Sequence, residues 1–383
     1  MEYIVTTPCG KLRGTETRVD GIVAYKGIRY ATAGRFEYPR EVTSWEGIYD
    51  ATEYGACAYQ ARAFCDEEQM PKKIFYYNEF RRGERYIYSE DCLFLNVFTP
   101  KEKGERLPVI IYIHGGSFTG GCGHEKHFDI PLWPTRGVIG VTINYRLGPL
   151  GFAVLPELKA EAGKTGNYGL YDQLTAINWV RHNIAAFGGD PDNITVMGQS
   201  AGAMSVQQHC LSPLTRGLFH KAVMSSGGGV SRMLAAASPE KHYAFWQMIM
   251  EKCGARTLDE VRSIPVEKLY AVWQDNKKAS MGGGCSPCVD GELAPRQEEN
   301  PSRTRVRSTE PTPTSSLKRS TIISHPSNEK NETHKAAFCR LLACERGQSG
   351  GGYRHRSRLS PHSARGERCL SQGIRLGYRK GSP

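Results

Sequence analysis

The fold of this chain is decided by one short stretch, Val196-Met197-Gly198-Gln199-Ser200-Ala201-Gly202-Ala203. β-rich residues 193–196 precede it, and helix-prone residues 203–211 follow it. A serine in a sharp strand-to-helix turn needs glycine neighbours, because the backbone turns tightly and packs closely there. Alone, a G-x-S-x-G pattern is more often a plain turn. In its strand–turn–helix context it predicts a nucleophile elbow, with Ser200 as the attacking group.

A second glycine-rich segment lies upstream of the elbow. Residues 107–113 have the pattern of a buried strand and lead into His114-Gly115-Gly116-Ser117-Phe118-Thr119-Gly120-Gly121. Acyl transfer builds negative charge on a carbonyl oxygen, which backbone N–H groups can stabilise. The expected donors of this oxyanion hole are the N–H groups of Gly116, Ser117 and Ala201. By itself the segment could be a simple turn, but its position before the elbow favours the oxyanion role.

The rest of residues 1–295 alternates between strand and helix patterns. Strands are predicted at residues 108–113, 138–143, 194–197 and 221–227, and helices at 171–187 and 239–252. Such alternation is typical of the α/β class, with an open, mostly parallel central sheet covered by helices on both faces. Neither a phosphate-binding loop nor a dinucleotide fingerprint is recognised, and we expect neither a cofactor nor a metal site.

Several further motifs resemble those of the type-B carboxylesterases, the carboxylesterase/cholinesterase family of the α/β-hydrolase fold. In chain order they are Y-K-G-I-R-Y-A at 25–31, E-D-C-L-F-L-N-V at 90–97, H-G-G-S-F at 114–118, N-Y-R-L-G-P-L-G-F at 144–152, G-N-Y-G-L-Y-D-Q at 166–173, F-G-G-D-P at 187–191 and the Ser200 elbow. The resemblance covers residues 3–295 and ends near V-D-G-E-L at 289–293. It implies a carboxylic ester hydrolase that acts through an acyl-enzyme on Ser200, with a small-molecule ester and water as substrates.

The resemblance also implies roles for residues outside the elbow. Arg35 and Glu90 are expected to form a buried ion pair that holds the early loops. Asn144, Arg146 and Asp172 are expected to tie loops together, rather than to touch substrate.

Two members of the catalytic triad are not found in this sequence. A serine hydroxyl needs an imidazole to take its proton and a carboxylate to orient that imidazole, and in this fold both follow the serine in the chain. After residue 295 the sequence shows neither the family's acidic motif nor its glycine-flanked histidine. His334 lies in the right order, but its surroundings predict a disordered segment, which cannot position a base. We therefore expect feeble or absent turnover from this chain.

The composition changes after residue 295. Residues 296–383 contain 18 Lys or Arg, seven Asp or Glu, and only 11 Leu, Ile, Val or Phe, so they carry the whole net charge of +11. So few apolar residues predict disorder. The expected organisation is an esterase domain at 1–295, incomplete at its C-terminus, followed by a basic tail at 296–383. A frame shift explains this tail better than a genuine appendage, so we expect no nucleic-acid partner; the basic tail keeps that alternative open.

The N-terminus and the cysteines bear on location. Residues 1–8 lack the features of a signal peptide, and no apolar run is long enough to span a membrane, so a cytoplasmic protein without a membrane partner is expected. By resemblance, Cys57 and Cys92 occupy places that secreted relatives bridge, but reduced thiols are expected in the cytoplasm. The lone C-x-x-C of Cys285 and Cys288 is interpreted as a coincidence.

One alternative function remains open beside the hydrolase. Some relatives with this fold have lost the triad and serve adhesion, so the chain could be a non-catalytic, esterase-like binding protein. The intact elbow and glycine loop argue against this alternative.

Overall fold

Aliphatic and β-branched residues at 107–113 form strand β10 (Leu107–Ile113), at the centre of the main sheet. The computed structural model describes residues 2–72, 74–128, 130–228, 236–294, 306–307 and 320–324. They all belong to the first of two units into which the chain divides, Met1–Leu342.

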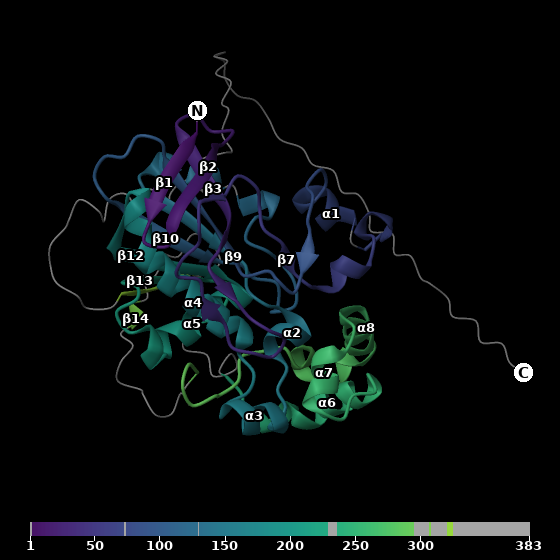
Figure 1. Ribbon diagram of the computed structural model, residues 1–383. Coiled ribbons are helices and arrows are strands. Elements are labelled where there is room, and N and C mark those ends of the chain that lie inside the picture. Colours follow the sequence, from purple (N-terminus) through teal and green to yellow (C-terminus); the bar gives the residue numbers. More distant parts are fainter. Residues whose placement is uncertain are drawn as a thin grey trace, which may run out of the picture. The chain divides into compact units, whose positions relative to one another are not determined.

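Figure 1 shows the strands and helices of this unit. The strands are β1 (Tyr3–Thr7), β2 (Gly10–Glu16), β3 (Ile22–Arg29), β4 (Ala31–Thr32), β5 (Arg40–Glu41), β6 (Ile48–Asp50), β7 (Cys57–Ala58), β8 (Tyr88–Ser89), β9 (Phe94–Pro100), β10 (Leu107–Ile113), β11 (Ile139–Ile143), β12 (Gly189–Gln199), β13 (Lys221–Ser225), β14 (Val306–Arg307) and β15 (Ser320–Ser324). The α-helices are α1 (Ile74–Phe80), α2 (Gly148–Phe152), α3 (Pro156–Ala162), α4 (Tyr168–Asn183), α5 (Ala201–Leu211), α6 (Glu240–Lys252), α7 (Leu258–Ser263) and α8 (Val266–Asn276).

The main sheet has a parallel centre and antiparallel flanks. Its strand order in the described part of the chain is β1-β2-β3-β9-β11-β10-β12-β13-β15-β14. β11, β10, β12 and β13 run parallel to one another, whereas β9 joins β11 antiparallel and β3 joins β9 antiparallel. The strands predicted at 108–113, 138–143 and 221–227 are therefore confirmed to within two residues at their ends, and the strand predicted at 194–197 is confirmed but extends from Gly189 to Gln199.

Both faces of the sheet are covered. Tyr25 and Val97, which are partners across β3 and β9, point into the large core, while the next pair, Ala24 and Phe98, points the other way. On that second face the 3-10 turns at 126–136 pack Ile130 against Ala24 and Phe98. This alternation follows from the two-residue period of a strand, and it confirms the expectation of a sheet buried on both sides.

Two helices position the elbow region. α5 packs against β12 and β13, and α4 packs against β12. The helix predicted at 171–187 begins earlier, at Tyr168, and is α-helical to Asn183, after which a 3-10 turn occupies Ile184–Phe187. α4 is buried over most of its surface, with Trp179 fully inside, which explains its weak amphipathic pattern.

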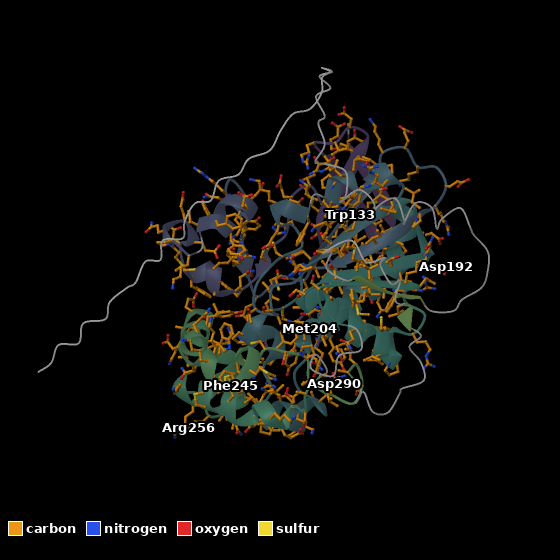
Figure 2. All side chains as sticks on the ribbon, turned by 180° about the vertical axis from the view of Figure 1, so that it is seen from behind. Trp133, Asp192, Met204, Phe245, Arg256 and Asp290 are labelled. Carbon is orange, nitrogen blue, oxygen red and sulfur yellow. The ribbon has the colours of Figure 1, made fainter. Side chains whose placement is uncertain are left out.

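The helices α6, α7 and α8 gather beside one another (Figure 1). The rings of Phe245 and Trp246 in α6 lie 5.2 Å apart in a T-shaped arrangement; Phe245 is labelled in Figure 2, within this group of helices. α7 begins with a capping box, because Thr257 accepts a hydrogen bond from the N–H of Glu260 and the Glu260 carboxylate accepts from the N–H of Thr257.

Two short pieces of the predicted tail are strands. β15 pairs antiparallel with β13, and β14 pairs antiparallel with β15. The β-branched run Thr321-Ile322-Ile323 favours a strand, and β13 offers an open edge for it. The disorder expected for 296–383 stays a prediction. The remaining tail residues lie outside the described part of the chain. The domain boundary at residue 295 stays a prediction.

Candidate active site

Ser200 lies in the tight turn between β12 and α5. Its backbone has φ 55° and ψ −121°, a conformation that side chains rarely adopt and that costs on the order of 1–3 kcal/mol. Two backbone hydrogen bonds hold the turn: the N–H of Ser200 donates to the carbonyl of Ser225 (2.9 Å), and its own carbonyl accepts from Met204 (3.0 Å). The strained turn leaves the Ser200 side chain partly exposed at the start of the helix.

The glycines around Ser200 are required by close packing. A Cβ on Gly198 would lie 2.4 Å from the carbonyl oxygen of Gly202, inside the turn itself. A Cβ on Gly227, just after β13, would lie 2.5 Å from the carbonyl oxygen of Ser200. Real Cβ atoms essentially never come so close, so the elbow has room for glycine alone at these places. The G-x-S-x-G pattern of the sequence predicted Gly198 and Gly202, whereas it did not predict the need for glycine at position 227.

The glycine loop leaves the neighbouring strand at the same edge. β10 and β12 are parallel, and Ile113 is the register partner of Gly198, so the two turns begin side by side at the carboxyl ends of their strands. A Cβ on Gly115 would lie 3.2 Å from the Cβ of Ser200. The structure therefore brings the start of the predicted oxyanion loop into contact with the predicted nucleophile.

The loop itself has an unusual backbone. Gly116, Ser117 and Phe118 have φ values of 111°, 56° and 59°. The carbonyl of Gly116 accepts from the N–H groups of Thr119 and Gly120, both at 3.0 Å. Among the hydrogen bonds of the described residues, none uses the N–H of Gly116 or Ser117 as its donor, and both residues are exposed.

The third predicted donor lies at the first position of α5. The N–H of Ala201 has no carbonyl partner four residues back within the helix, because the helix begins there. The aligned peptide dipoles also place positive charge at this helix end. An anion beside Ser200 would thus meet donors from two directions.

The amide side chains of Gln60 and Asn144 anchor the glycine loop. The sequence did not predict either of them at this place. Gln60 bonds Gly121 twice, accepting from its N–H (2.9 Å) and donating to its carbonyl (3.0 Å). Asn144, expected to tie loops, accepts from the N–H of Gly123 (2.7 Å) and donates to the carbonyl of Ala56 (2.9 Å). No motif around Gln60 signals its role, because its partner lies 61 residues away in the chain.

Every histidine ring that the structure describes has a partner other than Ser200. His114 sits beside its Gly115 carbonyl at 2.8 Å, His124 beside Cys57 at 3.6 Å, His182 beside Glu41 at 3.4 Å, His209 beside Gln173 at 2.9 Å, His220 accepts from the Ile194 N–H at 3.2 Å, and His242 sits beside Ser280 at 3.2 Å. His334 lies outside the described residues. Within the described part, no imidazole is hydrogen-bonded to the predicted nucleophile.

Two of these histidines are held neutral by burial. The His114 ring is buried and stacks on Tyr145 at 4.4 Å, and its removal from water lowers its pKa. Burial lowers the pKa of His209, on the inner side of α5, to about 3. His209 accordingly belongs to a buried network in which Gln173 also donates to Ser205 (3.1 Å). Both rings serve the scaffold.

The expected ion pair of Arg35 and Glu90 is present, and Arg146 and Asp172, which were expected to tie loops together, form a second one. Arg35 forms two bonds to the Glu90 carboxylate, and its side chain is largely buried. Arg146 holds Asp172 through its Nε (2.9 Å) and an Nη (2.7 Å), with the Asp172 side chain fully buried. Arg146 also donates to the carbonyl of Glu37 (2.8 Å), so it links the early loops to α4.

The described cysteines are free thiols, Cys57 and Cys92 included. Cys285 and Cys288 point to different carbonyls, those of Gly283 (3.5 Å) and Thr165 (3.6 Å). These two thiols are not part of any cluster suited to a metal in the described residues. The one such cluster there is Cys57, Cys122 and His124, and the expectation that the chain offers no metal site stays a prediction.

The sheet is partly parallel, and a strained serine turn and a glycine loop lie at the ends of neighbouring strands. These features together define the class of α/β-hydrolases. This chain belongs to the carboxylesterase family, whose sequence profile matches residues 1–337. It is 40% identical over 271 residues to the para-nitrobenzyl esterase of Bacillus subtilis (strain 168), a match that covers 70% of this chain and 51% of the esterase. It is 32% identical over 334 residues to Neuroligin-2 of Mus musculus, covering 77% and 39% of the two chains.

Solved structures agree with the sequence matches. A thermophilic PNB esterase superposes with a TM-score of 0.66 at 34% identity, covering 78% of this chain and 60% of that one. A Geobacillus stearothermophilus carboxylesterase superposes with a TM-score of 0.64 at 35% identity, covering 76% and 56%. The predicted fold is thus confirmed.

The chain spans about half the length of the curated Bacillus relative. Among the described helices, none combines the length and apolar character needed to cross a membrane.

Proposed function

We propose that the site hydrolyses small-molecule carboxylic esters, with Ser200 as the nucleophile. The observation that carries the proposal is the contact between the strained Ser200 turn and the start of the glycine loop at Gly115. Family membership supports the same reaction class.

In the proposed reaction, Ser200 Oγ attacks the ester carbonyl carbon and loses its proton. The negative charge that forms on the carbonyl oxygen is stabilised by the N–H groups of Gly116, Ser117 and Ala201. The C–O bond to the alcohol then breaks, and the alcohol leaves with a proton. Water attacks the acyl-enzyme in the second half, which releases the acid and restores the Ser200 hydroxyl.

We further propose that turnover by this chain is impaired, because no base is hydrogen-bonded to Ser200 within the described residues. The engagement of every described imidazole with other partners supports this part of the proposal. In other serine hydrolases, loss of the base costs about a million-fold in turnover, while the oxyanion hole and binding retain about a thousand-fold over water.

The decisive test measures p-nitrophenyl butyrate hydrolysis by the full chain and by Ser200→Ala. We expect slow hydrolysis, about a million-fold below ordinary esterases, and nearly the same rate for Ser200→Ala, because losing one member of the Ser–His pair costs about as much as losing both. Hydrolysis at ordinary esterase rates that disappears in Ser200→Ala would refute the impairment and keep the nucleophile. Equal rates of the two proteins in added imidazole, with both folded, would refute the nucleophile.

Added imidazole sharpens this test by supplying a base from solution. We expect it to raise hydrolysis by the full chain above the same imidazole solution containing Ser200→Ala. The rate measured with Ser200→Ala gives the background reaction of imidazole with the ester, which is then subtracted. A second matched variant, Ser226→Ala, changes a serine of similar backbone strain (φ 54°) outside the elbow and should keep the rescue.

The alternative is a non-catalytic, esterase-like binding protein. The absence of a described imidazole at Ser200 favours it, as does the match to Neuroligin-2 over a longer stretch than the match to the Bacillus esterase. Covalent labelling of Ser200 by a fluorophosphonate, abolished in Ser200→Ala, would favour the hydrolase over this alternative.

The cytoplasmic location and the domain boundary at residue 295 are kept as proposals.

A further inference from the structure

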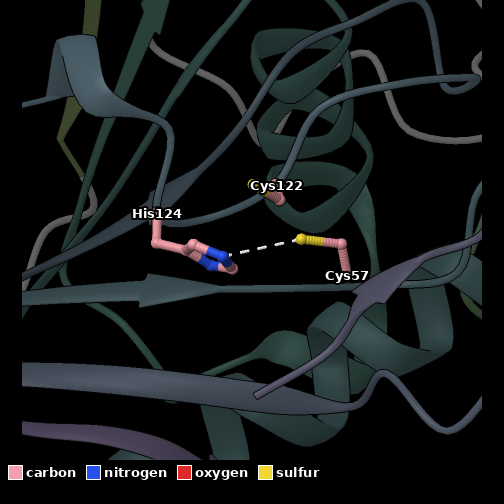
Figure 3. Close-up of side chains that lie close together, drawn as sticks. All are labelled: Cys57, Cys122 and His124. Atoms are coloured by element: carbon pink, nitrogen blue, oxygen red, sulfur yellow. Dashed lines mark hydrogen bonds between the residues drawn. The ribbon is translucent and has the colours of Figure 1, made fainter. Parts of the chain in front are cut away.

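Three side chains distant in the sequence meet beside the glycine loop. Cys57 comes from β7, while Cys122 and His124 follow the glycine turn. Their Sγ and ring nitrogen atoms all lie within 4.8 Å of one another. Figure 3 shows the Cys57 thiol and the His124 imidazole pointing toward each other, with Cys122 beside them.

The spacing matches a tetrahedral metal centre. Zinc binds thiolate sulfur at about 2.3 Å and imidazole nitrogen at about 2.0–2.1 Å, so tetrahedral angles place these two ligand atoms roughly 3.5 Å apart. Cys57 Sγ and His124 Nε2 are 3.6 Å apart. Since the remaining separations are at most 4.8 Å, shifts of under about 1 Å complete a Cys₂His set.

The backbone that carries these ligands is already fixed. Cys122 lies between Gly121, whose N–H donates to Gln60, and Gly123, whose N–H donates to Asn144. The same Asn144 side chain donates to the carbonyl of Ala56, next to Cys57. One amide therefore joins the two segments that supply the thiols, which reduces the ordering cost of binding a cation.

The imidazole is also oriented in advance. The ring of Tyr54 stacks on His124 at 4.4 Å with an interplanar angle of 8°, and Tyr86 stacks on it at 5.4 Å. Arg62 and Glu125, both largely buried nearby, form an ion pair at 2.6 Å. Because Glu125 balances the Arg62 charge, this pair adds little net repulsion toward a cation.

We propose that Cys57, Cys122 and His124 form a binding site for a thiophilic divalent cation, Zn²⁺ in particular. Thiolate and imidazole ligands select zinc over the hard cations Mg²⁺ and Ca²⁺. Three protein ligands leave a fourth position, which water can fill. Bound there, the cation joins β7 to the segment that follows the oxyanion loop.

The experiment titrates the full chain, metal-free and kept reduced by a phosphine, with Co²⁺ and then with Zn²⁺. Co²⁺ bound to thiolate gives a sulfur-to-metal charge-transfer band in the near ultraviolet. We expect one Co²⁺ per chain with this band, displacement by Zn²⁺, and a Zn²⁺-dependent rise in the midpoint of thermal unfolding. This titration of the unaltered protein needs no variant to fold.

Variants then assign the ligands. Cys57→Ser and Cys122→Ser should each reduce the charge-transfer band, and His124→Gln should weaken Co²⁺ binding at least tenfold. Cys285→Ser is the matched control, because that buried cysteine lies outside the cluster, and it should change nothing. A reduced, folded wild-type chain without the band would overturn the proposal, as would a band that survives in the Cys57→Ser/Cys122→Ser double variant.

Discussion

Gly202, the second residue of α5, lies directly against the carbonyl oxygen of Ile113, the last residue of β10. A Cβ at Gly202 would come within 2.1 Å of that oxygen. This contact sets how closely the elbow helix approaches the strand that leads into the glycine loop. It therefore determines the distance between Ser200 and the loop's N–H groups.

The first prediction concerns this contact. Gly202→Ala should push α5 away from β10 and destabilise the protein by about 1–3 kcal/mol, the usual cost of overpacking. Urea unfolding measures the change, and slower fluorophosphonate labelling should accompany it. Gly104→Ala is the control, because nothing lies within 4 Å of its Cβ position. Equal stability of the two variants would contradict the packing argument.

The second prediction concerns the buried ion pair of Arg146 and Asp172. Asp172→Asn leaves the Arg146 charge buried without its partner, so the free energy of unfolding should fall by about 3–5 kcal/mol. Asp91→Asn breaks the much more exposed pair with Arg29 and should cost about 1 kcal/mol or less. Comparable losses in both variants, measured by urea unfolding, would show that burial does not decide the outcome.

The third prediction concerns Gln60, which holds Gly121. Gln60→Leu keeps the volume but leaves the Gly121 N–H and carbonyl without their partner, so stability should fall by about 1–3 kcal/mol. Labelling of Ser200 by a fluorophosphonate should also slow, because the loop loosens. Gln69→Leu, at an exposed position, should leave both measurements within error. A Gln60→Leu protein as stable as the wild type would contradict the anchoring role.

The fourth prediction concerns acid. Burial lowers the pKa of His209 to about 3, against about 6.5 in an unfolded chain. Between these two pH values the unfolded state therefore binds a proton that the folded state does not bind. The contribution of His209 to the free energy of unfolding is fully present above about pH 6.5, and it is lost as the pH falls from there toward about 3. Between pH 7 and pH 5 the loss from this histidine is about 2 kcal/mol.

Unfolding measured at both pH values tests this sign. His209→Gln should lose less stability on acidification than the wild type, although it is less stable at pH 7. His182→Gln, at an exposed histidine, should follow the wild type. If His209→Gln lost as much on acidification as the wild type does, the buried ring would not be the cause.

The sequence predicted the sheet centre and the elbow because both depend on local patterns. The apolar runs around Val109 and Ile194 form strands where they were expected, and the glycines at 198 and 202 are required by contacts of 2.4 Å or less. The antiparallel flank of β1, β2 and β3 was not predicted, because polar and charged residues interrupt the apolar pattern, as Lys11 and Arg13 do in β2 and Lys26 does in β3.

By itself, then, the amino-acid sequence determined the strand–turn–helix at Ser200, the glycine loop and the family, since each rests on residues adjacent in the chain. Only the tertiary structure decided the partners of Gln60 and the meeting of Cys57 with Cys122 and His124. These contacts join segments more than 60 residues apart. No local pattern encodes them, because they arise only when the packed sheet brings separate loops to one edge.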